Sequence, residues 1–157
     1  MASDHVEIAT SNCRVILDPS ASTEQLREAV CALRRVLSRE SAPPITAVTG
    51  IDGAMNRLVE LMRSEDDTIA FDAAWGVTNV ASGTSTDTAA AVEAGAVPAF
   101  IDIIQRNLAV NNARSWDLID QCIVCAALAS PGASDPNTAA VSHRLCALFR
   151  LTTVGLR

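Results

Sequence analysis

Apolar residues recur along the first part of the chain with the spacing of an α-helix. Four of them stand at i, i+4, i+7 and i+11: Leu26, Val30, Leu33 and Leu37. This spacing gathers them on one helix face. Ser22 or Thr23 suits the N-cap position, and Glu24 and Gln25 follow directly. The pattern therefore predicts a helix from residue 22 or 23 to about Arg39.

Proline and glycine divide the next part of the chain into shorter segments. Pro43-Pro44 ends the first helix and begins a short one that runs through Val48, after which Gly50 and Gly53 follow. Beyond these breaks the sequence predicts helices at 54–62, 86–93, 97–105 and about 112–129, a longer helix between the acidic turn at 65–67 and Gly83, and one more after Pro136.

The helix that ends at Gly83 has two different faces. At 100° per residue, one face gathers small and apolar residues and is predicted to point into the core: Ile69, Ala73, Gly76, Val77 and Val80. The other face gathers larger and polar residues: Phe71, Trp75, Thr78, Asn79 and Ser82. Trp75 and Asn79 stand one turn apart, so both can touch one partner. This pair suits a peptide, because an amide hydrogen-bonds to backbone groups and an indole packs on an alkyl stem or a cation.

The order of short and long segments repeats along the chain. Gly53 and Gly95 are 42 residues apart, and the same shift carries Leu33 to Trp75. A period near 42, built from one short helix and two longer ones, is in the range of armadillo-type repeats. We therefore predict an all-α fold, a right-handed armadillo-type α-solenoid of about three repeats, the last incomplete.

The predicted solenoid covers residues 23–157. Residues 1–22 mix polar and apolar residues without a clear period. They are predicted to form a loose N-terminal arm with at most a short helical piece.

Composition and charge narrow the possible partners. The 157 residues are 49% hydrophobic and 19% charged, a globular composition, and the low aromatic content of 3% favours closely packed helices. The net charge of −6 argues against nucleic acid or an anionic membrane as partner and favours a basic peptide. No segment approaches 18 apolar residues and no secretory leader is evident, so a cytoplasmic or nuclear location is expected.

Cysteine and histidine do not predict a catalytic centre. The five cysteines are expected to be reduced thiols. His5 and His143 lie at opposite ends, and no nucleophile elbow or phosphate loop is present, so no enzyme is predicted. The alternative is a zinc site formed by Cys122-x-x-Cys125 with His143-x-x-Cys146. Both pairs lie in helix-like apolar sequence without the usual turn, and we predict neither a metal nor a cofactor.

Two blocks of sequence resemble importin alpha, the armadillo adaptor that carries proteins with nuclear localisation signals to the nucleus. The first block is Leu37-Ser38-Arg39-Glu40 followed by Pro43-Pro44-Ile45. The second is Ala74-Trp75 through Thr78-Asn79, Ala81-Ser82-Gly83-Thr84-Ser85, and then Gly95-Ala96-Val97-Pro98-Ala99-Phe100-Ile101. Together they cover about residues 24–106, which corresponds to the first repeat and most of the next in that family.

The resemblance implies a peptide-binding site in a concave groove, where Trp and Asn pairs of successive repeats form a ladder. Trp75 would pack along the alkyl stem of a signal lysine, and Asn79 would hold the peptide backbone extended. Ser82, Gly83 and Thr88 match positions that help to form the lysine pocket. Four more positions match the contact with the downstream part of the signal: Leu37, Ser38, Arg39 and Glu40.

The third repeat departs from the family pattern and can be aligned in two ways. By period, Trp116 lies 41 residues after Trp75 and is the next indole, with Asp120 in place of the expected Asn. By helix end, Val124 and Leu128 occupy the two positions, and the second rung is missing.

Two functions follow from the sequence. The first is a nuclear import adaptor of the cytoplasm and nucleus that binds lysine-rich nuclear localisation signals. Importin beta is not expected as a partner, because that family begins with an arginine-rich segment and residues 1–22 hold only Arg14 as a basic side chain besides His5. The alternative is an armadillo scaffold that binds a folded partner or self-associates through an uncapped end repeat.

Overall fold

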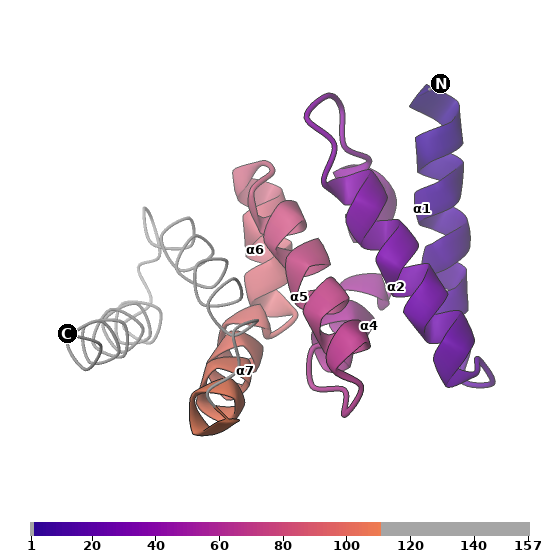
Figure 1. The fold of residues 1–157 in the computed structure, drawn as a ribbon. Coiled ribbons are helices and arrows are strands. Elements are labelled where there is room, and N and C mark those ends of the chain that lie inside the picture. The colour runs from indigo at the N-terminus through magenta and orange to yellow at the C-terminus, as the bar shows by residue number, and fades with distance from the viewer. Residues whose placement is uncertain (1, 111–157) are drawn as a thin grey trace.

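The computed structural model describes residues 2–110, which form seven helices and no strand. The helices are α1 Ala2–Leu17, α2 Thr23–Leu37, α3 Ile45–Thr49, α4 Ala54–Leu61, α5 Asp67–Ala81, α6 Ser85–Glu93 and α7 Ala96–Val110. In Figure 1 the chain advances from α1 through α2 and α5 to α7. Helix α2 packs on both α1 and α5, and α7 contacts α4 and α6. The all-α prediction is confirmed. The helices expected at 112–129 and after Pro136 lie outside the described residues.

The first helix corrects one prediction. Residues 1–22 were expected to be loose, but Ala2–Leu17 is a helix packed against α2. Three of its residues stand at i, i+4 and i+7 and are fully buried: Ala9, Cys13 and Ile16. These three residues are enough to pack the helix on its neighbours, but they are too few to give a clear helical period in the sequence. The helix depends on tertiary packing, which the sequence pattern does not show.

Capping explains where α2 begins. The Ser22 hydroxyl accepts the Gln25 backbone N–H at 3.2 Å, and the Gln25 side-chain oxygen accepts the Ser22 backbone N–H at 2.8 Å. This reciprocal capping box satisfies two donors that a helix N-terminus leaves free. Val30, Leu33 and Leu37 are at most 2% exposed. The predicted helix and its core face are confirmed.

The helices α3, α4 and α5 form one repeat unit of a short and two longer helices, and α6 and α7 begin the next. Gly53 and Gly95 precede α4 and α7, with φ of 76° and 87°. This left-handed conformation strains residues with a Cβ, which accounts for glycine at both positions. The 42-residue spacing of these two glycines is therefore a structural repeat.

The same spacing does not hold for α2 and α5. Their N-caps, Ser22 and Asp66, are 44 residues apart, and a shift of 44 carries buried Leu33 onto buried Val77. The predicted correspondence of Leu33 with Trp75 is therefore wrong by two residues. The chain between α2 and α4 is two residues longer than between α5 and α7, and it contains Pro43-Pro44.

Arginine side chains join successive units at two places. Arg57 of α4 donates its Nε to the Ile16 carbonyl near the end of α1 at 3.0 Å. Arg106 of α7 donates to the Met62 carbonyl just after α4, also at 3.0 Å. Each guanidinium satisfies a carbonyl that a helix C-terminus leaves unpaired. Arg57 and Arg106 stand at different positions of α4 and α7, but each contact ties its helix to the C-terminal end of a helix in the preceding unit.

Candidate functional site

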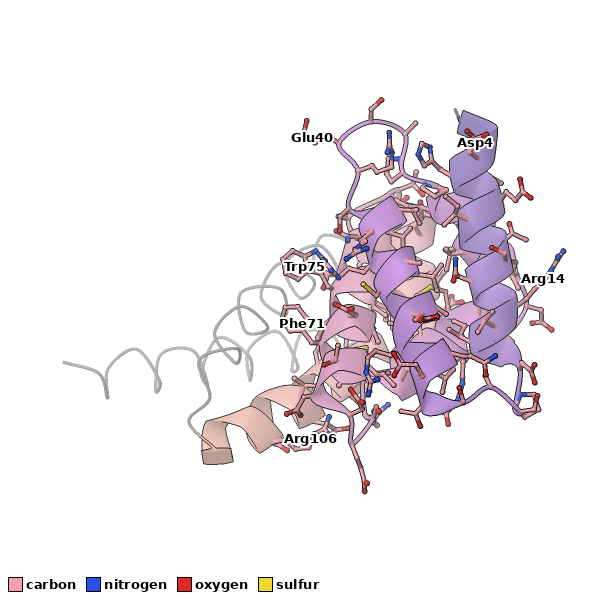
Figure 2. All side chains as sticks on the ribbon, turned by 45° about the vertical axis from the view of Figure 1, so that its right-hand side comes forward. Asp4, Arg14, Glu40, Phe71, Trp75 and Arg106 are labelled. Atoms are coloured by element: carbon pink, nitrogen blue, oxygen red, sulfur yellow. The ribbon has the colours of Figure 1, made fainter. Side chains whose placement is uncertain are left out.

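A partly exposed stripe runs along the otherwise buried helix α5. Phe71, Trp75 and Asn79 stand at i, i+4 and i+8 and remain partly accessible, whereas most of their neighbours in α5 are buried. Figure 2 shows Phe71 and Trp75 projecting from the same side of α5. Two side chains near the end of α2, Arg34 and Ser38, reach this stripe. We call these five residues the α2–α5 face.

A short chain of hydrogen bonds fixes the Asn79 carboxamide. Its Nδ2 donates to the Ser38 hydroxyl at 2.9 Å, and that hydroxyl donates to the Arg34 carbonyl at 2.7 Å. The amide of one unit is thus held by the C-terminal turn of the preceding unit. Two predicted site residues, Asn79 and Ser38, are brought together, and the carboxamide keeps an acceptor oxygen for a partner.

The Trp75 indole has neighbours on two sides. The Phe71 ring meets it edge-on, with the centroids 5.5 Å apart at 62°. The Arg34 guanidinium lies over the indole, 5.6 Å from its centroid. Arg34 also forms an ion pair with Asp72, its Nε 2.7 Å from the carboxylate Oδ1. Sequence reasoning missed Arg34, although its place one helical turn before Ser38 puts it on the same side of α2.

Hydroxyl groups close the C-terminal end of α5. The Ser82 hydroxyl donates to the Asn79 carbonyl at 2.7 Å, and the Thr88 hydroxyl donates to the Ala81 carbonyl at 2.7 Å. Because both protons go to backbone carbonyls, each hydroxyl oxygen keeps its lone pairs as acceptors. Gly83 is closely packed, and a Cβ there would come within 2.7 Å of Asp87 Oδ2. Oxygen atoms at a helix C-terminus favour a cation.

Several predicted site residues lie elsewhere. Leu37 is 2% exposed and belongs to the core, so a peptide cannot reach it. Thr78, expected on the exposed side of α5, is 4% exposed and donates its hydroxyl to the Ala74 carbonyl. Arg39 and Glu40 are exposed in the connection after α2, and Figure 2 shows Glu40 on the loop beyond that helix. Trp116 lies outside the described residues.

The N-terminal end of α5 carries a charge pair. Asp66 caps the helix by accepting the Thr68 and Ile69 N–H groups, and Arg27 of α2 donates to its other oxygen at 2.6 Å. The hydrogen bond from Arg27, followed by that from Ile69, lowers the pKa of Asp66 below 3.8. This contact joins α2 to the start of α5, whereas the Asn79–Ser38 hydrogen bond joins the two helices near the end of α5. The two helices are therefore connected near both ends of α5.

Other features of the described region do not coincide with the α2–α5 face. A depression of about 360 Å³ lies between the α3–α4 segment and α6, and none of the predicted site residues lines it. Within residues 2–110 no three His, Cys, Asp or Glu side chains are placed to hold a metal ion. The four residues of the zinc alternative lie beyond that range. None of the described helices combines the length and apolarity that a membrane span requires.

Comparison with known proteins finds a matching family model and several similar sequences. The Armadillo/beta-catenin-like repeat family model matches residues 42–82. Importin subunit alpha of Saccharomyces cerevisiae is 46% identical over 82 residues, 52% of this chain and 15% of that protein. Importin subunit alpha-2 of Arabidopsis thaliana is 44% identical over 78 residues, 49% of this chain and 14% of that protein.

Solved structures share the architecture. A computationally designed armadillo repeat protein for modular peptide recognition superposes with a TM-score of 0.66 at 17% identity, covering 88% of this chain and 52% of that one. A second designed armadillo repeat protein gives a TM-score of 0.64 at 18% identity with the same coverage. At these identities the likeness concerns the fold alone.

The stacked units have the armadillo fold of these solved structures, and one segment of the chain matches the armadillo repeat model. The curated proteins that match the sequence are importin alpha subunits, which confirms the resemblance found in the sequence. The matching stretch spans about 15% of the length of those relatives.

Proposed function

We propose that the α2–α5 face binds a lysine-rich peptide of the nuclear localisation signal kind, and that the chain acts as an import adaptor of the cytoplasm and nucleus. One observation carries this proposal: Trp75 and Asn79 stand one turn apart and partly exposed, with Asn79 held by Ser38 of the preceding unit at 2.9 Å. The relatedness to importin subunit alpha over about half of the chain supports it.

The chemistry of the face fits such a ligand. The four methylenes of a lysine need an apolar wall, which the Trp75 indole supplies, and its ammonium needs acceptors, which Ser82 and the carbonyls ending α5 supply. The carboxamide of Asn79 can bond to the peptide backbone. Each contact contributes about 0.5–2 kcal/mol, so one rung gives weak binding and several lysines in register give useful affinity.

A peptide titration tests the proposal. A fluorescently labelled lysine-rich signal peptide is titrated with the parent chain and with Trp75→Ala, Asn79→Ala, read by fluorescence anisotropy. We expect saturable binding by the parent at or below about 100 μM and at least about tenfold weaker binding by the double variant. The controls are Asn56→Ala, an exposed amide on α4, and the same peptide with its lysines replaced by alanine. Failure of the parent to saturate would sink the proposal.

A second candidate function rests on two exposed apolar side chains of α1. Val6 and Ile8 are 47% and 38% exposed, and their i, i+2 spacing puts them on opposite flanks of the buried face of the helix. The scaffold alternative uses either flank of α1 for a folded partner or a second copy and needs no signal peptide. A discrete dimer in sedimentation velocity, converted to monomer by Val6→Gln with Ile8→Gln, together with no peptide binding, would favour it over the import proposal.

A further inference from the structure

The Trp75 indole already has a cation on it, supplied by the chain itself. The guanidinium of Arg34 lies 5.6 Å from the ring centroid, within the range of a cation–π contact. Arg34 belongs to α2, whereas Trp75 belongs to α5 of the next repeat unit. The contact therefore crosses the boundary between two units at the point where the proposed site lies.

Asp72 holds this guanidinium in place. Its Oδ1 is 2.7 Å from the Arg34 Nε, and the Asp72 side chain is only 8% exposed while that of Arg34 is 25% exposed. Asp72 stands three residues before Trp75, so both groups that receive Arg34 come from the same side of α5. A buried carboxylate with a cationic partner resists displacement, because removing the partner leaves an unpaired charge with little water.

The geometry restricts where a ligand can approach the indole. Arg34 covers one face of the ring, and Phe71 meets the ring at 62° with a centroid distance of 5.5 Å. A second cation cannot occupy the position of the Arg34 guanidinium, and repulsion disfavours one close beside it. A lysine stem therefore has to approach the remaining part of the partly exposed ring, whose orientation is fixed before the ligand arrives.

We infer that Arg34, anchored by Asp72, is a positioning residue of the peptide site: its guanidinium fixes the Trp75 indole and reserves one face of the ring, so that a ligand lysine enters from the other. This inference rests on the proposed function for its effect on binding. Its effect on the indole itself is independent of any peptide, which separates the two in an experiment.

The test uses Arg34→Lys, which keeps the charge and loses the planar fork, and Arg34→Met with Asp72→Asn, which removes both charges and leaves no unpaired carboxylate. Arg14→Met is the matched control, since Arg14 is an exposed arginine on α1, far from Trp75 in Figure 2. The Trp75 indole N–H is observed by nitrogen-edited NMR without peptide and is assigned by Trp75→Phe. Peptide affinity is then measured well below the melting temperature of each variant.

We expect the neutral double variant to shift the Trp75 indole resonance, to increase the motion of the indole, and to weaken peptide binding about 3- to 30-fold. Arg34→Lys should fall between this variant and the parent, and Arg14→Met should leave the indole resonance unchanged. An unchanged indole resonance in the double variant, or tighter peptide binding, would overturn the inference. If the parent binds no peptide, the proposed function fails, and the indole resonance still decides whether Arg34 orients Trp75.

Discussion

Gly76 lies inside α5, between Trp75 and Asn79, where nothing in the backbone requires glycine. The residue is in an ordinary helical conformation, and a Cβ added there would meet only Leu37 Cδ1, at a relaxed 3.9 Å. Glycine costs a helix interior about 0.5–1 kcal/mol relative to alanine. We predict that Gly76→Ala raises the free energy of unfolding by about this amount in urea titrations, with peptide binding retained.

Gly83 provides the contrast for this prediction. A Cβ at Gly83 would lie 2.7 Å from Asp87 Oδ2 and 2.9 Å from Ile45 Cδ1, so two packed side chains would have to move. Asp87 accepts from Thr84 at the start of α6, and moving it disturbs that cap. Gly83→Ala should therefore destabilise the chain by about 1–2 kcal/mol. Equal effects of the two substitutions would contradict this account of local packing.

Single residues of the face were predicted well where periodicity decides the environment. The spacing of Trp75 and Asn79 correctly placed both on the accessible stripe of α5. Thr78 is predicted on the same side because its angle on the helical wheel is close, but it is buried and donates its hydroxyl to the Ala74 carbonyl. Arg34 could not be paired with Trp75 or Asp72 from the sequence, since that pairing depends on how α2 lies across α5 in space.

At the scale of the helix, the charge pair at the start of α5 makes stability depend on pH. The pKa of Asp66 lies below its ordinary value of 3.8 because Arg27 and the helix N–H groups bond to the carboxylate. A lowered folded-state pKa stabilises the fold above pH 4, and this contribution is lost as the pH falls through the folded pKa. Asp66→Asn should therefore reduce the fall in the free energy of unfolding at acid pH, which we call the acid limb.

The substitution keeps a side chain that caps helices well, so it isolates the charge from the cap. Urea unfolding between pH 7 and pH 2.5 measures the limb, with Asp67→Asn, an exposed acid in the same first turn, as control. The control should retain the acid dependence of the parent. A parent-like acid limb in Asp66→Asn would show that the Arg27 contact contributes nothing to the pH dependence.

The docking of α1 can be followed through its cysteine. Cys13 is fully buried, and this burial raises its pKa to about 11, whereas Cys31 of α2 is partly exposed. At pH 8 the raised pKa suppresses the Cys13 thiolate, which is the reactive form, and burial keeps the reagent away from the sulfur. We predict that iodoacetamide alkylates Cys31 at least about ten times faster than Cys13, as read by peptide mass spectrometry. Rates should converge in 8 M urea, and equal native rates would mean that α1 is not docked.

Helices with strong end signals were predicted almost to the residue, and α1 was not. Ser22 and the Pro43-Pro44 pair are local signals, and the structure places the ends of α2 and α3 close to them. Residues 1–22 carry only a sparse apolar spacing, whose meaning depends on a partner helix. That helix is stable because Ala9, Cys13 and Ile16 are buried where α1 packs on α2, α3 and α4. A tertiary cause of this kind is not visible in a local pattern.

At the scale of the molecule, one repeated unit explains most of the architecture. Each unit buries its apolar faces against its neighbours, so similar packing recurs along the stack. The predicted 42-residue period holds for Gly53 and Gly95, where the backbone requires glycine. The period does not hold between α2 and α5, because the two connections differ by two residues, and this difference shifts every corresponding position on the face.

The proposed peptide site joins these scales, because it needs a partly exposed pair on one helix, a capping turn of the helix before it, and two units held in a fixed relation. The face is therefore tested best by observing its own side chains. Nitrogen-edited NMR of the labelled chain, during titration with a lysine-rich signal peptide, reports the Trp75 indole N–H and the Asn79 carboxamide directly. We predict that both resonances move and saturate together, while Ala9 and Cys13 of α1 stay in place. Saturable shifts confined to α1, or no shift of Trp75 and Asn79 at millimolar peptide, would contradict the account.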